Sequence, residues 1–484
     1  MKKFLTVLFL TGLLTAGIAA AENPAKTAGA GRAILGINDD QKRIVVTAVT
    51  ADGSAIQVEG CTVTKLPSGE RTMLTATGPK VILKGAITKL DCGGNRLTEL
   101  NVQGLTALQK LFCDDNLLTS LDVSGVTALQ SLSCGENLLI SLDVSGLTGL
   151  RELYCNRNHL SSLDVQSLTA LQDLFCNANK LTSLNVQDLK VLQRLHCNSN
   201  RLTSLDVRNL SALQELDCVG NELTSLDVHG VTALWELECS KNMLTLLDVQ
   251  SLTSLSKLDC SANQLTSLDV RNLAALEELD CSNNKLTALY VQGLNALQKL
   301  YCSENELTSL EIQGLKTLQK LNCYKNKLTS LNVQGLTALQ WLNCGYNELT
   351  TLNLKGLHAL RDLECFKNNL AELDVQDINT LQRLNCYHNK LSTLELSTLH
   401  GLQELCCYNN LFNEKTLIRI LTALPDRKQK KEGRALIYGK KNDPREGTIT
   451  DFSSSAELKA AFEAAKAKNW RFYKRDTVGN EEEV

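Results

Sequence analysis

Leucine and cysteine recur along the chain with one fixed period. Cysteines stand 21 residues apart at sixteen positions, from Cys92 to Cys407. A leucine stands two residues before each of them and an asparagine three residues after, as in Leu111-Phe-Cys113-Asp-Asp-Asn116. The unit reads LxxLxCxxNxLTxLDVxxLxx, and the alternation of apolar and polar positions in LxxLxC is typical of a short β-strand. A fixed period of this length indicates stacked repeats that share one continuous core.

The unit also predicts how each turn folds. LxxLxC places a parallel strand on one face, and its Leu and Cys stack on the same residues of the next turn. The asparagine amide both donates and accepts, so it can satisfy buried backbone groups. LTxLDV echoes LxxLxC, and neither half of the 21-residue unit has room for a long helix. At a strand spacing of ~4.8 Å, the array is about 75 Å long.

Both ends of the array are predicted to be caps, because a solenoid needs a polar outer face at each end. Residues 40–86 alternate in the β manner and contain the hairpin signal Asp52-Gly53, which predicts an N-terminal β cap. After residue 412 the period stops, and the pattern predicts helices over 414–424 and 456–468 with strands over 435–438 and 470–473. The predicted fold class is an α/β solenoid of 16 units over residues 87–412, with a parallel sheet on its concave face and a C-terminal α/β cap over 413–484.

The first residues indicate export. Lys2 and Lys3 precede an apolar run that ends at Ala19-Ala-Ala21, a pattern typical of a secretory signal peptide over residues 1–21. The alternative, an uncleaved anchor, is disfavoured because a membrane span needs ~20 apolar residues. Residues 22–39 are rich in Ala and Gly and are predicted to be a flexible leader. Cell surface, medium and periplasm remain open as destinations.

Composition and the spacing of the cysteines exclude several classes of function. The net charge of −3 excludes a nucleic-acid binder that works by bulk positive charge. The chain has no CxxC pair, so no zinc site, other metal site or cofactor is predicted. Stacked strands hold equivalent Cβ atoms about 4.8 Å apart, wider than the ~3.8 Å of a disulfide, so the repeat cysteines are predicted to be buried apolar residues. Only Cys61 and Cys406 lie off the ladder.

A family resemblance follows from these residues. The recurring LTSLDVxGLTALQ-LxCxxN, together with the flanks Asp52-Gly-Ser-Ala-Ile-Gln-Val-Glu-Gly-Cys61 and Lys468-Asn-Trp-Arg-Phe-Tyr473, resembles the exported leucine-rich-repeat proteins of oral spirochaetes and Bacteroidetes. The resemblance covers almost the whole mature chain. It implies a surface or periplasmic protein, and some members are adhesins toward host components or other bacteria.

In such repeats the outward strand residues form the concave binding face. Here these are the residues one and three before each cysteine, together with the two after it. Three groups are predicted to bind a ligand there. They are the N-terminal rings Phe112, Tyr154 and Phe175, followed by His196; the acids Glu215, Asp217, Glu236, Glu238, Asp259, Glu278 and Asp280; and the C-terminal rings Tyr324, Trp341, Tyr346, Phe366, Tyr387 and Tyr408. The acids could steer a basic partner, hold a loose Ca²⁺ or form a solvated face.

No catalytic constellation is present: the chain has no GxSxG, HExxH, P-loop or GxGxxG motif in a βαβ setting. We therefore predict a binding module with no catalytic residues and no transmembrane segment. Its expected role is a surface adhesin for a protein or glycan partner on host or bacterial surfaces. The alternative is a periplasmic scaffold with no adhesive role.

Overall fold

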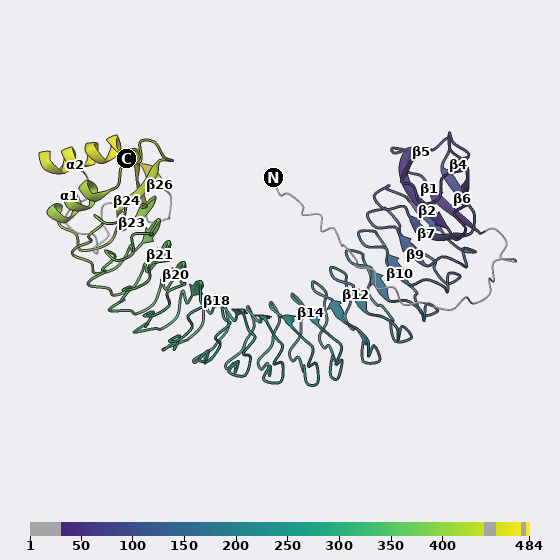
Figure 1. Cartoon of the computed structure of the whole chain (residues 1–484), viewed down its shortest axis with the longest axis horizontal. Coiled ribbons are helices and arrows are strands. Elements are labelled where there is room, and N and C mark those ends of the chain that lie inside the picture. Colours follow the sequence, from purple (N-terminus) through teal and green to yellow (C-terminus); the bar gives the residue numbers. More distant parts are fainter. Residues whose placement is uncertain (1–30, 440–451, 476–480) are drawn as a thin grey trace.

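The computed structural model describes residues 31–439, 452–475 and 481–484, and within these the chain forms one curved solenoid. The arc is open between its two ends, and the strands lie along its inner side (Figure 1). The signal peptide predicted for residues 1–21 lies outside the described residues.

Sixteen parallel strands line the concave side, one before each repeat cysteine. They give fifteen full turns of 21 residues between Cys92 and Cys407, which confirms the predicted fold class. Neighbouring strands pair in register, so that Leu111 lies opposite Leu132 and Leu132 opposite Leu153. The strands are β7 (Ile87–Asp91), β9 (Lys110–Phe112), β10 (Ser131–Ser133), β11 (Glu152–Tyr154), β12 (Asp173–Phe175), β13 (Arg194–His196), β14 (Glu215–Asp217), β15 (Glu236–Glu238), β16 (Lys257–Asp259), β17 (Glu278–Asp280), β18 (Lys299–Tyr301), β19 (Lys320–Asn322), β20 (Trp341–Asn343), β21 (Asp362–Glu364), β22 (Arg383–Asn385) and β23 (Glu404–Cys406).

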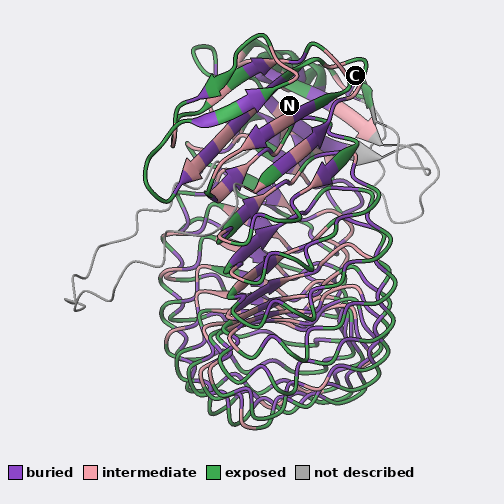
Figure 2. Ribbon diagram, turned by 90° about the vertical axis from the view of Figure 1, so that its right-hand side faces the viewer, coloured by how far each residue is buried: buried purple, intermediate pink, exposed green. Residues whose placement is uncertain are grey.

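The core of each turn is aliphatic. The repeat cysteines and the strand leucines are buried from one end of the array to the other, and the outer edges of the turns are exposed (Figure 2). No helix interrupts the solenoid between β7 and β23. The curvature follows because the strand side of every turn is paired edge to edge, whereas the opposite side is built mainly from turns.

A ladder of buried asparagines joins successive turns. Asn116 Nδ2 donates to the carbonyl of Cys92 in the preceding turn at 3.1 Å and to that of Cys113 in its own turn at 3.0 Å. Its Oδ1 accepts from the backbone N–H of Leu97 at 2.8 Å. Each such bond contributes about 1 kcal/mol, and each buried backbone group left without one would cost more. The repeat asparagine therefore holds neighbouring turns at a fixed spacing.

The N-terminal cap is an antiparallel β structure. Its strands are β1 (Arg32–Gly36), β2 (Arg43–Thr50), β3 (Ile56–Glu59), β4 (Lys65–Leu66), β5 (Thr72–Thr75), β6 (Lys80–Lys84) and β8 (Glu99–Asn101). One sheet has the order β4-β3-β6-β1-β8. Strand β2 pairs with β5 and also, antiparallel, with the first ladder strand β7, so the cap closes the open edge of the solenoid.

The flexible leader predicted for residues 22–39 is wrong over residues 32–36. These residues form β1, which pairs with β6 on one side and β8 on the other. Ala33 and Leu35 alternate inward and are fully buried. The Ala- and Gly-rich composition concealed this short alternation, because small residues suit a buried central strand as well as a flexible segment.

The C-terminal cap continues the ladder and covers its last turn. Strand β24 (Gly433–Gly439) pairs parallel with β23, β25 (Trp470–Arg475) pairs with β24, and β26 (Glu481–Glu483) pairs antiparallel with β25. Helices α1 (Glu414–Ala423) and α2 (Ala456–Ala467) pack against each other. Asn413 caps α1 by accepting from the N–H of Thr416 at 3.0 Å. The cap is thus α/β, as predicted.

Candidate functional site: the concave face

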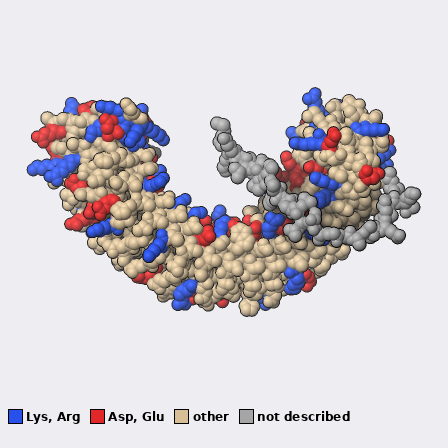
Figure 3. Space-filling view, viewed as in Figure 1, with Lys and Arg blue, Asp and Glu red and all other residues tan. Residues whose placement is uncertain are grey.

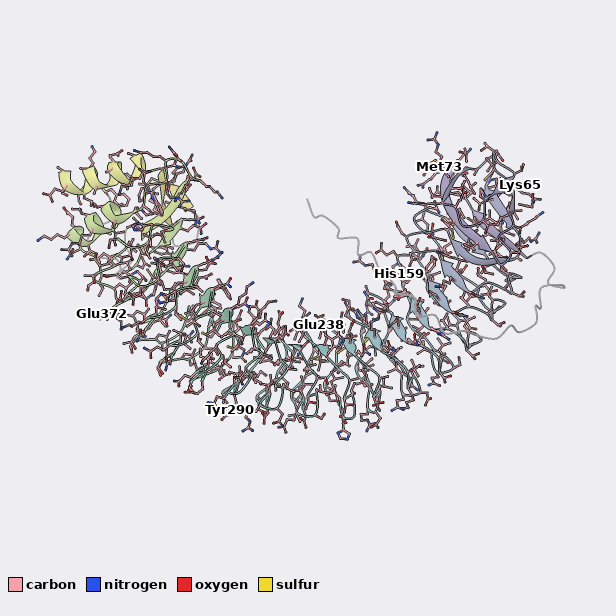
Figure 4. All side chains as sticks on the ribbon, in the orientation of Figure 1. Lys65, Met73, His159, Glu238, Tyr290 and Glu372 are labelled. Atoms are coloured by element: carbon pink, nitrogen blue, oxygen red, sulfur yellow. The ribbon has the colours of Figure 1, made fainter. Side chains whose placement is uncertain are left out.

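The concave face carries the outward residues of the ladder strands. In most strands the middle leucine is buried and its two neighbours are half-buried, as in β15, where Glu236 and Glu238 flank Leu237. Glu238 lies on the inner side of the arc, whereas Tyr290 projects from the outer side (Figure 4). The candidates at one and three residues before a cysteine therefore lie on the concave face, as the sequence predicts.

Three rings at the N-terminal end form one stack. The ring centroids of Tyr154 and Phe175 lie 4.9 Å apart, and those of Phe175 and His196 lie 4.2 Å apart. Phe112 is separate, because Ser133 occupies the strand between it and Tyr154, and its ring instead faces Lys89 Nζ at 5.4 Å. The stack covers three consecutive strands.

The acidic residues are interleaved with cations. Lys257 Nζ lies 2.7 Å from Glu236 Oε1 and also contacts Glu238, and Lys299 Nζ lies 2.8 Å from Glu278 Oε2. His196 lies 3.5 Å from Glu215. Acidic and basic side chains lie side by side along the inner edge of the arc (Figure 3). The described residues contain no group of three or more His, Cys, Asp or Glu that could hold a metal ion.

Three aspartates that directly precede a repeat cysteine accept hydrogen bonds from nearby backbone N–H groups. Asp217, Asp259 and Asp280 each accept from the N–H two residues on, at distances of 2.9 to 3.1 Å. Burial, and to a smaller extent the nearby Glu238 carboxylate, raise the pKa of Asp217 to about 6. Burial also raises the pKa of Asp280. This face therefore carries less negative charge near pH 6 than its acidic residues suggest.

The C-terminal rings form a continuous aromatic rim, defined as Tyr324, Tyr346, Phe366, Tyr387 and Tyr408. Phe366 and Tyr387 stack with centroids 4.9 Å apart and an interplanar angle of 7°, and Tyr387 and Tyr408 stack at 4.6 Å and 5°. Tyr324 meets both Tyr346, at 6.0 Å, and Phe366, at 5.8 Å. The sequence group is thus brought together in space, except for Trp341.

Trp341 and Tyr408 differ from the prediction. Trp341 stands on strand β20, where its ring lies 6.5 Å from that of Tyr301, so it is not part of the rim. Tyr408 is only 9% exposed, because the C-terminal cap follows directly after the last turn. Tyr408 therefore ends the stack as a packing residue and offers no contact surface.

Tyr346 is the exposed member of the rim. It is 46% exposed, and its backbone has φ 56°, in the left-handed region. Every residue two positions after a repeat cysteine adopts this conformation, and the others are Gly, Ala, polar or charged residues. Tyr346 is the one large apolar residue among these sixteen positions. Lys367 Nζ lies 4.8 Å from the centre of the Tyr346 ring.

Sequence reasoning missed a cavity between the last repeats and the C-terminal cap. Its volume is about 280 Å³, and its lining includes Asp362, Glu364, Arg383 and Arg434. Arg434 was not a candidate because it follows the end of the period, and Asp362, Glu364 and Arg383 lie at outward repeat positions outside the three predicted groups. Strand β24 extends the parallel sheet beyond the last repeat. Its pairing with β23 places Arg434 opposite Glu404, in line with the outward residues of the repeat strands.

The chain is similar to known repeat proteins. Residues 253–296 match the family model described as leucine-rich repeats, two copies. The functional domain of InlJ from Listeria monocytogenes, described as including a cysteine ladder, is 31% identical, with a TM-score of 0.63 over 76% of this chain and 78% of that one. A leucine-rich-repeat protein of Leptospira interrogans is 28% identical, with a TM-score of 0.52 over 69% and 81%.

A plant protein extends the comparison. The ectodomain of a membrane receptor kinase from Arabidopsis thaliana, solved in complex with a Casparian strip integrity factor, is 26% identical, with a TM-score of 0.60 over 70% of this chain and 46% of that one. None of the curated proteins matches the sequence. Within the described residues, no helix combines the length and the apolar character needed to cross a membrane.

Proposed function

The chain belongs to the leucine-rich-repeat family, and on that premise we propose that it is an exported binding module that holds a protein partner on its concave face, at the aromatic rim. Leucine-rich-repeat domains bind protein partners, and the solenoid is an interaction scaffold rather than an enzyme fold. The side chains of this chain determine which part of the surface meets the partner.

The exposed ring of Tyr346 carries the proposal. A non-glycine residue in the left-handed region costs of the order of 1 kcal/mol or more, and a large exposed ring gains little in return from folding. Lys367 lies over this ring without a carboxylate partner among the described residues. Aromatic residues of this kind are common anchors at interfaces. We attribute a large ring that faces solvent and adds little to folding stability to contact with a partner.

The remaining rim supports that anchor. Tyr324, Phe366 and Tyr387 are half-buried, and their mutual stacking fixes them before any partner arrives. Binding to fixed rings costs less side-chain entropy than binding to mobile ones. The N-terminal stack of Tyr154, Phe175 and His196 offers a second rigid surface on the same face. A partner that spans the arc would meet both.

The proposed setting is the cell surface, with the protein acting as an adhesin for host or bacterial partners. Support comes from the signal peptide predicted over residues 1–21. The test is protease treatment of intact cells, followed by detection of the chain. Cleavage on intact cells supports surface display. Cleavage only after lysis of the outer membrane contradicts it and favours a periplasmic scaffold.

A further inference from the structure

Four parallel strands at the C-terminal end of the concave face form the floor of the 280 Å³ cavity. Strands β21, β22, β23 and β24 pair in register, so their outward residues form two rows across the floor. The first row is Asp362, Arg383, Glu404 and Arg434, and the second is Glu364, Asn385, Cys406 and Leu436. The four strands lie along the inner side of one arm of the arc (Figure 1).

The two acidic and two basic side chains of the first row balance one another in charge. Its charges alternate from strand to strand, and Arg383 Nε lies 2.7 Å from Asp362 Oδ1. Arg434 stands opposite Glu404 in the register, and its guanidinium also lies 5.0 Å from the centre of the Tyr473 ring. These side chains hold one another in place, so the first row forms a fixed, nearly neutral wall.

The second row is graded from acidic to apolar. Glu364 accepts from Asn343 Nδ2 at 3.3 Å, but no Lys or Arg of the described residues makes an ion pair with it. Burial raises its pKa, and the charge of the nearby Arg383 only partly opposes this effect. At the other end of the row, the Cys406 thiol and Leu436 are apolar.

Between these ends, the row carries an unpaired acceptor. Asn385 Oδ1 is buried, and within the described part of the chain no donor reaches it. Buried polar atoms in folded proteins almost always have a partner, and Asn385 lines the cavity, so a turn of its amide toward the cavity would let a bound donor pair with this oxygen. The cavity therefore offers one carboxylate that makes no ion pair among the described residues, one amide oxygen without a donor beside it and an apolar end.

We propose that this cavity binds an aliphatic ammonium group, and that its source is a lysine side chain of the protein partner. The ammonium has three N–H donors and no acceptor, which matches the Glu364 carboxylate and Asn385 Oδ1. Its methylene stem lies against Cys406 and Leu436, as lysine stems commonly do on apolar surfaces. The proposal deepens the proposed function and rests on it, since the partner supplies the lysine.

Cys406 provides a built-in reporter of occupancy. It is half-exposed in the cavity, and Cys61, also half-exposed, lies in the N-terminal cap and serves as the internal control. The full chain is alkylated with iodoacetamide in the presence of the peptide acetyl-Gly-Gly-Lys-Gly-Gly-amide, and the rate at each thiol is read by mass spectrometry. The peptide should slow alkylation of Cys406 and leave Cys61 unchanged.

Matched peptides and variants separate the possible outcomes. A peptide with norleucine in place of lysine should give no protection, and a lysine-free peptide with a free amino terminus should protect less than the lysine peptide. Glu364→Gln should weaken protection by the lysine peptide about tenfold, because it removes the charge and keeps the shape. Glu348→Gln, at an exposed acid on the same arm, should have no effect.

Three results would overturn the proposal: equal protection by the norleucine peptide, no protection by the lysine peptide, or unchanged protection in Glu364→Gln. Stronger protection by the free amino terminus would assign the site to a chain terminus and would overturn the lysine assignment. Tyr346→Gly should leave peptide protection intact, because the rim is not part of the cavity lining. If Tyr346→Gly loses partner binding but keeps peptide protection, the rim contacts the partner and the cavity binds the lysine peptide independently. The two proposals can therefore fail separately.

Discussion

The ring of Phe366 occupies the space beside Gly345: a Cβ added to Gly345 would lie 2.7 Å from Phe366 Cε1. Gly345 is the residue after a repeat cysteine, the same position that carries Tyr324 in the previous turn and Phe366 in the next. Because residue 345 has no side chain, the ring centroids of Tyr324 and Phe366, which lie two turns apart, approach to 5.8 Å. The continuity of the aromatic rim therefore depends on a missing side chain.

Gly345→Ala is expected to open the rim. The methyl group forces the Phe366 ring aside, which costs about 1 kcal/mol of overpacking and separates Phe366 from Tyr324. We expect partner binding to weaken while the free energy of unfolding falls only slightly. Binding and urea denaturation of the same variant check this. Unchanged binding would show that rim continuity is not needed.

Tyr346→Gly is expected to separate stability from function. Glycine relieves the left-handed backbone strain, and the variant loses the contact between the ring and Lys367, an effect of similar size. The free energy of unfolding should stay within about 1 kcal/mol of the wild-type value. Thermal unfolding measures it. A large loss of stability would mean that the ring is a structural residue.

Asn242→Ala is expected to weaken the middle of the array. Asn242 Nδ2 donates to the carbonyls of Cys218 and Cys239 at 3.0 and 3.1 Å, and its Oδ1 accepts from the N–H of Leu223 at 3.0 Å. Loss of this side chain leaves these buried backbone groups without partners, which should lower the free energy of unfolding by about 2–4 kcal/mol. Urea denaturation measures the loss. Asn295→Ala, at an exposed asparagine, is the control and should change stability little.

Asp217 makes stability depend on pH. Its folded pKa of about 6 is above its ordinary value of 3.8, so the folded state holds this proton more tightly than the unfolded state does. Its contribution is most favourable below pH 3.8 and is lost as the pH rises to about 6. Asp217→Asn should therefore have a higher free energy of unfolding than wild type at pH 7. At pH 3.5 the two proteins should have the same free energy of unfolding. Urea midpoints across this range test the sign, and a larger gain at low pH would contradict it.

The thiol chemistry should divide the eighteen cysteines into two classes. Cys61 and Cys406 are half-exposed, whereas the ladder cysteines are buried, and burial raises the pKa of thiols such as Cys239. We expect iodoacetamide to modify only Cys61 and Cys406 in the native protein and all cysteines after denaturation. Rapid native labelling of Cys239 would show that the ladder opens locally.

The repeat could be predicted from the sequence because each turn repeats the same buried positions. The strand at residues 32–36 could not, since its alternation is short and its composition resembles a linker. Trp341 was grouped with the rim, and Tyr408 was expected to be accessible, because sequence shows that a residue points outward but not which neighbour it meets or what covers it. The cavity beside Arg434 depends on the cap continuing the sheet, a relationship that no periodicity indicates.

The central claim, that the aromatic rim contacts the partner, is tested most directly by comparing an exposed tyrosine of the rim with an exposed tyrosine of the convex side. Tyr346 and Tyr290 are 46% and 51% exposed, and each has a cation over its ring, but Tyr290 lies on the convex side. The measurement is attachment of beads coated with wild-type protein, Tyr346→Gly or Tyr290→Gly to host and bacterial cells. The account predicts that Tyr346→Gly loses attachment about tenfold while Tyr290→Gly attaches like wild type. Equal attachment by all three proteins, or loss with Tyr290→Gly alone, would contradict it.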